Sequence, residues 1–140
     1  MSQPIKLLLD ECLGKPLIED VERLLSWDVP KPNIKHLLDF FNEGTCDSVW
    51  IPQVAKEGWV ILTADRAKKS RHAKLPDICK HYKITHILMS SSVLNLKQNQ
   101  KANAIVGVWE QIKLCADAPS GTRFYFRLTS AKTPTIKLAS

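Results

Sequence analysis

The sequence predicts an α/β fold in which a mainly parallel sheet has helices on both faces. Two runs, Ile5–Leu9 and Trp59–Leu62, are apolar except for Lys6 and are too short for helices, which is typical of strands buried on both faces. Between them, Leu17, Val21 and Leu25 follow the spacing of a helix. This alternation favours a parallel sheet of four or five strands within a single domain that spans all 140 residues.

Proline and glycine define the boundaries of the expected elements. Pro16 suits the first turn of a helix, and that helix should end near Asp28 because Pro30 and Pro32 cannot continue it. Gly58 should end a later helix and lead into a strand. The last twelve residues are expected to be poorly ordered or weakly strand-like. The expected strands are 5–9, 33–38, 59–62, 85–89 and 122–128, and the expected helices are 15–28, 48–56, 76–82 and 98–116.

The net charge of +6 is distributed unevenly along the chain. Residues 1–65 contain six basic and eleven acidic residues, whereas residues 66–83 contain seven basic residues and one acid. The basic segment begins directly after Asp65, so positive potential is expected beside any acidic site there. Such a juxtaposition suits a polyanionic substrate, although a solvated basic loop also explains it.

Composition also excludes some classes of protein. No charge-free run of 18 residues exists, so no membrane span is expected. The first residues lack the basic and apolar regions of a secretory signal, which predicts a cytoplasmic location. None of the four cysteines forms a C-x-x-C pair, so a zinc knuckle or dithiol site is not expected.

Three aspartates are the candidate site residues. Asp10 and Asp65 follow the first and third expected strands, and Asp47 lies at the start of the helix after the second strand, where it either caps the helix or faces a site. In an open parallel sheet, ligands bind beyond the carboxyl ends of the strands, where both strand-end acids should lie. A group of carboxylates without His or Cys partners favours Mg²⁺ or Mn²⁺. Such a metal can activate a water and neutralise charge on a phosphodiester.

The motifs around these aspartates resemble those of the PIN-like nuclease superfamily. They are Leu7-Leu8-Leu9-Asp10-Glu11, Gly44-Thr45-Cys46-Asp47-Ser48-Val49-Trp50 and Val60-Ile61-Leu62-Thr63-Ala64-Asp65. The branch they resemble is that of the small VapC-type toxins of bacterial toxin–antitoxin systems. The resemblance implies a three-layer α/β sandwich, metal-dependent cleavage of RNA, an antitoxin partner and a possible homodimer.

The resemblance also implies roles for individual residues. Asp10, Asp47 and Asp65 would be the catalytic and metal-binding acids, and Thr63 would support the carboxylate geometry. The family often has another acid two residues after the third aspartate, but here that position is Ala67. A fourth ligand would then come from Glu11, from Glu43 or from water. Three residues of the basic segment are the expected RNA contacts: Lys68, Lys69 and Arg71.

Two other functions are compatible with the sequence. A PIN-like scaffold that binds RNA without cutting it is compatible with Ala67. A phosphoacceptor receiver domain would also place acids after its first and third strands, but its required lysine after the fifth strand has only Lys132 as a candidate. Tyr125, between Arg123 and Arg127, could contact nucleic acid, although the ordinary alternation of an edge strand explains the pattern equally well.

Overall fold

The computed structural model describes residues 4–10, 12–28, 30–64 and 75–138. Within these residues, six strands form one sheet in the order β2-β1-β3-β4-β5-β6. The first five strands are parallel and β6 is antiparallel to β5. The strands are β1 (Lys6–Leu9), β2 (Asn33–His36), β3 (Val60–Ala64), β4 (His86–Met89), β5 (Arg123–Leu128) and β6 (Pro134–Leu138).

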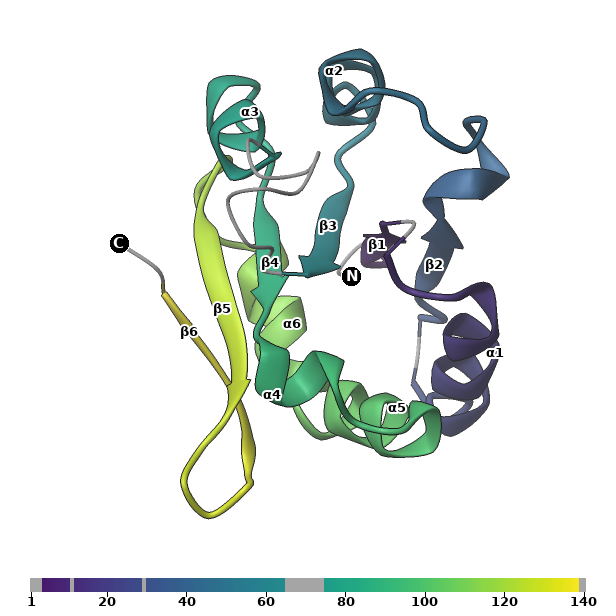
Figure 1. Cartoon of the computed structure of the whole chain (residues 1–140), viewed down its shortest axis with the longest axis vertical. Coiled ribbons are helices and arrows are strands. Elements are labelled where there is room, and N and C mark those ends of the chain that lie inside the picture. The colour runs from purple at the N-terminus through teal and green to yellow at the C-terminus, as the bar shows by residue number, and fades with distance from the viewer. Residues whose placement is uncertain (1–3, 11, 29, 65–74, 139–140) are drawn as a thin grey trace.

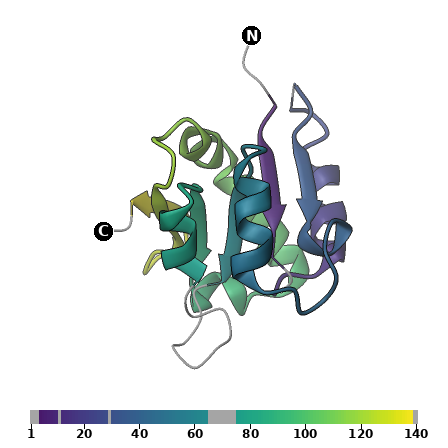
Figure 2. The same cartoon turned by 90° about the horizontal axis from the view of Figure 1, so that it is seen from above.

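Helices cover both faces of the sheet (Figures 1 and 2). The helices α2 and α3 lie at the top of Figure 1, and α1 and α5 lie at the bottom. The helical elements are α1 (Lys15–Leu24), the 3₁₀ turn η1 (Leu37–Asp39), α2 (Asp47–Ala55), α3 (Leu75–His81), α4 (Ser91–Leu94), α5 (Gln98–Gly107) and α6 (Trp109–Ala116).

The alternation of side chains along β1 divides the interior into two cores. Leu7 and Leu9 belong to the larger core, which α1, α5 and α6 complete. Leu8 points to the opposite face, where it joins the smaller core formed with Trp50 of α2 and Cys79 of α3. Both cores exclude water from continuous apolar strands, which is why these runs do not alternate with polar residues.

The strand order places a topological switch point between β1 and β3. From β1 the chain passes through α1 to β2 on one side, and from β3 it passes through α3 to β4 on the other side. The crevice at the carboxyl ends of such a strand pair is the usual ligand site of an open α/β sheet. The fold therefore directs attention to the residues that follow Leu9 and Leu62, which are paired in the register of β1 and β3.

The predicted fold class is confirmed, with local differences. The sheet has six strands rather than four or five, because the tail that was expected to be poorly ordered or weakly strand-like contains β6. The second strand ends at His36, where η1 begins. The expected helix over 98–116 is interrupted at Val108, whose backbone leaves the helical region directly after Gly107. No described helix is both long and apolar enough to cross a bilayer.

Candidate active site

Asp10 occupies the carboxyl end of β1 and is completely buried. Its backbone N–H donates to the carbonyl of Leu62 at 3.1 Å, which extends the pairing of β1 with β3 by one residue. Its carboxylate Oδ2 accepts a hydrogen bond of 2.8 Å from the hydroxyl of Thr63 in β3. Backbone and side chain together fix this carboxylate against the neighbouring strand, and this is the contact that the supporting role predicted for Thr63 requires.

Cys12 joins Asp10 and Thr63 in a three-residue cluster. Its Sγ lies 3.8 Å from Asp10 Oδ2 and 3.8 Å from Thr63 Oγ1. A thiol is a weak hydrogen-bond donor, so it orients the carboxylate without neutralising its charge. The Thr63 hydroxyl and the Cys12 thiol, both neutral, therefore help to hold the Asp10 carboxylate in place.

Asp47 is the first residue of α2 and is also buried, with 7% of its surface exposed. Cys46, rather than Asp47, is the N-cap residue, and Cys46 makes no side-chain capping hydrogen bond. The Asp47 Oδ1 atom accepts a hydrogen bond of 3.0 Å from the indole N–H of Trp50, one helical turn later. The partial positive charge of a helix N-terminus also favours a carboxylate at this position.

The charges of Asp10 and Asp47 both affect the pKa of the Cys79 thiol. Burial in α3 raises the pKa of Cys79, and the negative charges of Asp47 and Asp10 raise it further. One buried thiol therefore experiences the fields of both carboxylates. Asp10 and Asp47, 37 positions apart in the sequence, are thus both close enough to α3 to raise the pKa of Cys79, whereas the guanidinium of Arg123 lowers it.

His36 attaches the segment after Asp10 to the neighbouring strand. It is paired with Leu9 in the register of β1 and β2 and is buried. The backbone N–H of Leu38 donates to His36 Nδ1 at 3.1 Å, so Nε2 carries the proton and donates to the carbonyl of Leu13 at 2.6 Å. This pair of bonds holds residues 12–14 close to the carboxyl end of the sheet.

The structure places some of the predicted site residues and leaves others undescribed. Asp10, Asp47 and Thr63 are described and lie on the α2/α3 side of the sheet. In residues 4–10, 12–28, 30–64 and 75–138, no three His, Cys, Asp or Glu side chains form a metal-binding group. Asp10 and Asp47 supply oxygen donors only, which fits a hard cation such as Mg²⁺ or Mn²⁺. The predicted residues outside the described ranges are Glu11, Asp65, Ala67, Lys68, Lys69 and Arg71.

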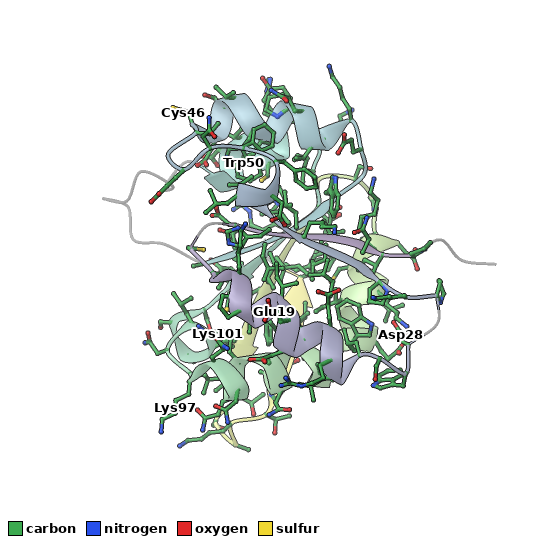
Figure 3. The ribbon with its side chains drawn as sticks, turned by 90° about the vertical axis from the view of Figure 1, so that its right-hand side faces the viewer. Glu19, Asp28, Cys46, Trp50, Lys97 and Lys101 are labelled. Carbon is green, nitrogen blue, oxygen red and sulfur yellow. The ribbon has the colours of Figure 1, made fainter. Side chains whose placement is uncertain are left out.

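Three residues of this region were not predicted to contribute to it. Trp50, labelled in Figure 3, was expected to be a core residue only. It is fully buried, and its indole N–H also donates to Asp47. Its spacing of three residues from Asp47 was the available signal, since such pairs are neighbours on a helix. Cys12 and Cys79 gave no such signal, because their contacts depend on the pairing of β1 with β3 and on the packing of α3.

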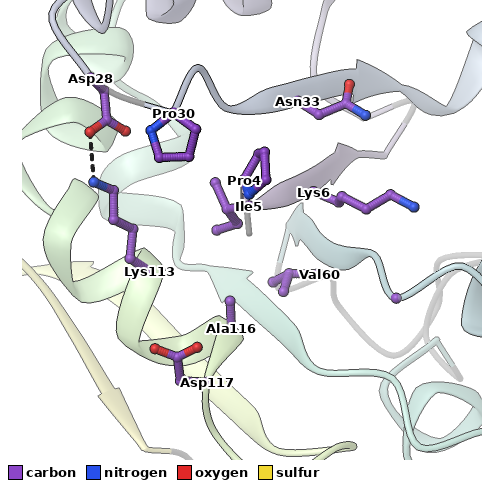
Figure 4. Close-up of a pocket in the computed structure, with 11 residues that line it drawn as sticks. Pro4, Ile5, Lys6, Asp28, Pro30, Asn33, Val60, Lys113, Ala116 and Asp117 are labelled. Atoms are coloured by element: carbon purple, nitrogen blue, oxygen red, sulfur yellow. Dashed lines mark hydrogen bonds and ion pairs between the residues drawn. The ribbon is translucent and has the colours of Figure 1, made fainter. Parts of the chain in front are cut away.

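A separate pocket of about 730 Å³ lies at the opposite, amino edge of the sheet (Figure 4). It is lined by the starts of β1, β2 and β3 and by residues of α6. Within it, Lys113 Nζ forms an ion pair with Asp28 Oδ1 at 2.7 Å, and the indole N–H of Trp109 donates to Asp28 Oδ2 at 2.7 Å. This volume is distinct from the carboxylate region, since the two lie at opposite ends of the strands.

One family model matches the chain. The family model described as a PIN-like domain matches residues 5–87, more than half of the chain. The matched range contains all three predicted aspartates and Thr63. Domains of this family are typically nucleases, so the match favours that class over a phosphoacceptor receiver domain. No curated protein and no solved structure has a significant match to the chain.

Proposed function

This chain belongs to the PIN-like domain family, and we propose that it is a metal-dependent endoribonuclease whose carboxylate site lies at the β1–β3 switch point. The observation that supports this most directly is the fixed carboxylate of Asp10. It is buried, oriented by Thr63 and Cys12, and situated where ligands of open α/β sheets bind. Burying a carboxylate away from water costs free energy, and a bound cation would offset part of that cost.

The proposed cofactor is Mg²⁺ or Mn²⁺. Asp10 and Asp47 would hold it together with Asp65 from the undescribed segment, and Glu11 would be a further ligand. When bound, the cation lowers the pKa of a water and offsets charge on the scissile phosphate. The described residues contribute orientation: Thr63 and Cys12 fix Asp10, and the Trp50 indole fixes Asp47.

We further propose that the substrate is RNA and that the protein acts in the cytoplasm as the toxin of a toxin–antitoxin pair. The motif resemblance to the VapC-type branch supports the antitoxin partner and a homodimer. The basic segment after Asp65 supports a polyanionic substrate, with Lys68, Lys69 and Arg71 as phosphate contacts. A catalytically weak or inactive RNA-binding scaffold is the second candidate, and Ala67 is the observation that favours it.

The decisive test is cleavage of single-stranded and structured RNAs with Mn²⁺, with Mg²⁺ and with EDTA. We expect cleavage only with a divalent metal. Asp65→Asn should reduce the rate about a hundredfold or more, since cation stabilisation of the transition state is worth several kcal/mol and each 1.4 kcal/mol is about tenfold in rate. The unfolding midpoint of the metal-free variant should equal or exceed that of the wild type, because Asn removes repulsion among carboxylates.

A wild-type protein that leaves all of these RNAs intact in both metals would contradict the nuclease proposal and favour the scaffold. Expression of the wild-type gene alone tests the toxin role separately. Growth should slow with the wild type and not with Asp65→Asn. Normal growth together with cleavage in vitro would contradict the toxin role and leave the nuclease intact.

A further inference from the structure

The strands β5 and β6 form one edge of the sheet, beyond the helices that cover its centre (Figure 1). In β5, Phe124, Phe126 and Leu128 pack on the larger core. Because side chains alternate, the residues between them point to the opposite face. That face of β5 consists of Arg123, Tyr125 and Arg127, and it is the same face on which α2, α3 and Thr63 lie.

The strand register connects this face with the carboxylate region. Thr63 is paired with Leu88, Leu88 with Tyr125, and Tyr125 with Lys137. Neighbouring strands are about 4.8 Å apart, so Tyr125 lies about 10 Å from Thr63 across the sheet. These four paired residues, Thr63, Leu88, Tyr125 and Lys137, form a row across the sheet. The row connects the Asp10–Thr63 pair at the site with a tyrosine and a lysine at the edge.

The exposed residues of this row and the next are cationic and aromatic. Tyr125 is 36% exposed, and Arg127 and Lys137 are also exposed. Arg127 is paired with Thr135, so no acidic residue opposes it across the two strands. Indeed, the chain contains no acidic residue after Asp117. Arg123 differs from Arg127 because its guanidinium is already engaged within the fold. It donates to His86 Nε2 at 3.2 Å and lies 3.8 Å from Asp77 of α3.

From this arrangement we propose that the β5–β6 face binds single-stranded RNA next to the cleavage site, with one base stacked on Tyr125 and backbone phosphates bound by Arg127 and Lys137. This inference rests on the proposed ribonuclease function and adds the surface and strandedness of the substrate. Exposed aromatic rings flanked by cations are the usual platform for single strands. Bases within a duplex remain stacked on each other, so the ring selects unpaired RNA.

Binding measurements in EDTA test the proposal without cleavage. The probes are a fluorescent single-stranded RNA and a duplex of the same sequence. Tyr125→Ala should weaken binding of the single strand by about 5- to 100-fold, the range of base–aromatic stacking. Tyr125→Phe retains the ring and should bind like the wild type. Duplex binding should be weaker and unaffected by either substitution.

A charge-matched pair of double variants tests the phosphate contacts. Arg127→Ala/Lys137→Ala should weaken binding and reduce the slope of log affinity against log salt by about 1.4, since each phosphate contact on a single strand contributes about 0.7. Arg23→Ala/Lys97→Ala removes the same two residue types from the exposed surface near α1 and α5, on the other side of the sheet. This control should retain the wild-type slope.

Wild-type affinity of Tyr125→Ala, or equal weakening by Tyr125→Phe, would overturn the stacking role. Photocrosslinking of wild-type protein to RNA that carries bromouridine provides a test that needs no variant, and an adduct is expected on Tyr125. Crosslinks confined to other residues would overturn the proposal. Binding through Tyr125 without cleavage in Mn²⁺ would refute the proposed nuclease alone, whereas cleavage with normal binding by Tyr125→Ala would refute this inference alone.

Discussion

The two ends of the sheet each hold a buried aspartate that accepts a hydrogen bond from a tryptophan, but the surroundings differ. At the amino edge, Asp28 accepts from Trp109 at 2.7 Å and also from the ammonium of Lys113 at 2.7 Å. At the opposite side, Asp47 accepts from Trp50 at 3.0 Å. There Asp10 is oriented by the hydroxyl of Thr63 at 2.8 Å.

The difference appears in the groups near each aspartate. The hydrogen bond to Asp28 is the main cause that raises the pKa of Lys113, so the charge of Asp28 stabilises a cation within the fold. Burial, and after it the charges of Asp47 and Asp10, instead raise the pKa of Cys79, a neutral thiol. The Thr63 hydroxyl and the Cys12 thiol orient Asp10 without bringing a charge of their own, whereas the lysine ammonium at Asp28 is a cation. The amino-edge pocket contains the Asp28–Lys113 ion pair, whereas the topological switch point directs attention to the carboxyl edge.

The largest expected effect comes from matched substitutions of the two aspartates. Asp10→Asn should reduce RNA cleavage by about a hundredfold or more, because it removes charge needed to hold the metal. Asp28→Asn should leave the cleavage rate nearly unchanged but lower the free energy of unfolding by about 1–3 kcal/mol, since it breaks a charged hydrogen bond in a buried setting. Single-turnover cleavage and urea unfolding measure the two quantities.

The contrast between the two edges would be wrong if Asp10→Asn and Asp28→Asn both changed mainly the cleavage rate or both changed mainly the free energy of unfolding. A loss of cleavage in Asp28→Asn at full stability would assign function to the amino-edge pocket. A large loss of stability in Asp10→Asn without loss of cleavage would make Asp10 a structural residue. Lys113→Met provides a control for Asp28, because it removes the same ion pair while leaving the carboxylate in place.

A smaller effect is expected from the hydroxyl that orients Asp10. Thr63→Val preserves the shape and β-branching but removes the 2.8 Å hydrogen bond, so we expect cleavage to fall about tenfold, in line with a hydrogen bond to a charged group of about 1.5–3 kcal/mol. The loss should appear in kcat rather than KM, since Asp10 is positioned for the reaction. Thr63→Ser should restore most of the rate.

Thr85→Val is the matched control, because Thr85 is also a buried threonine but lies before β4 at the amino edge. It should leave cleavage unchanged. Equal losses in both valine variants would indicate a general effect of buried threonine hydroxyls on the sheet, and not a role in orienting Asp10.

The fold was predictable because its strands are buried on both faces. Continuous apolar runs such as Leu7–Leu9 and Val60–Leu62 identified β1 and β3 before any contact was known. The sequence of β6 predicted only a poorly ordered or weakly strand-like segment, because it contains Pro134. Its strand forms through antiparallel pairing with β5, which the local sequence does not reveal. The break at Val108 was invisible, since the apolar spacing continues across it.

The site was predictable only in part, for a related reason. Asp10 directly follows β1 and Asp47 begins α2, and both elements have recognisable sequence patterns, so topology brings the two acids to the α2/α3 side of the sheet. The contact of Cys12 with Thr63, 51 positions away, depends on strand pairing, which leaves no mark on local sequence. Tyr125 illustrates the same limit: alternation gave its face, but only the register through Leu88 showed that it lies in the row of Thr63.

The smallest expected effect is a pH dependence of stability that comes from a buried histidine at the amino edge. His86 begins β4 at the amino edge, where burial lowers its pKa below the usual 6.5; the positive charge of Arg123 lowers it further, and the hydrogen bond to the Ile84 carbonyl opposes this. The unfolded chain therefore takes up a proton near pH 6.5 that the folded chain resists. Stability from neutral His86 is present above pH 6.5 and is lost as the pH falls below it. His86→Gln should flatten urea-unfolding stability between about pH 7 and 5, whereas the exposed control His81→Gln should not. An unchanged pH slope in His86→Gln would show that another group causes any acid sensitivity.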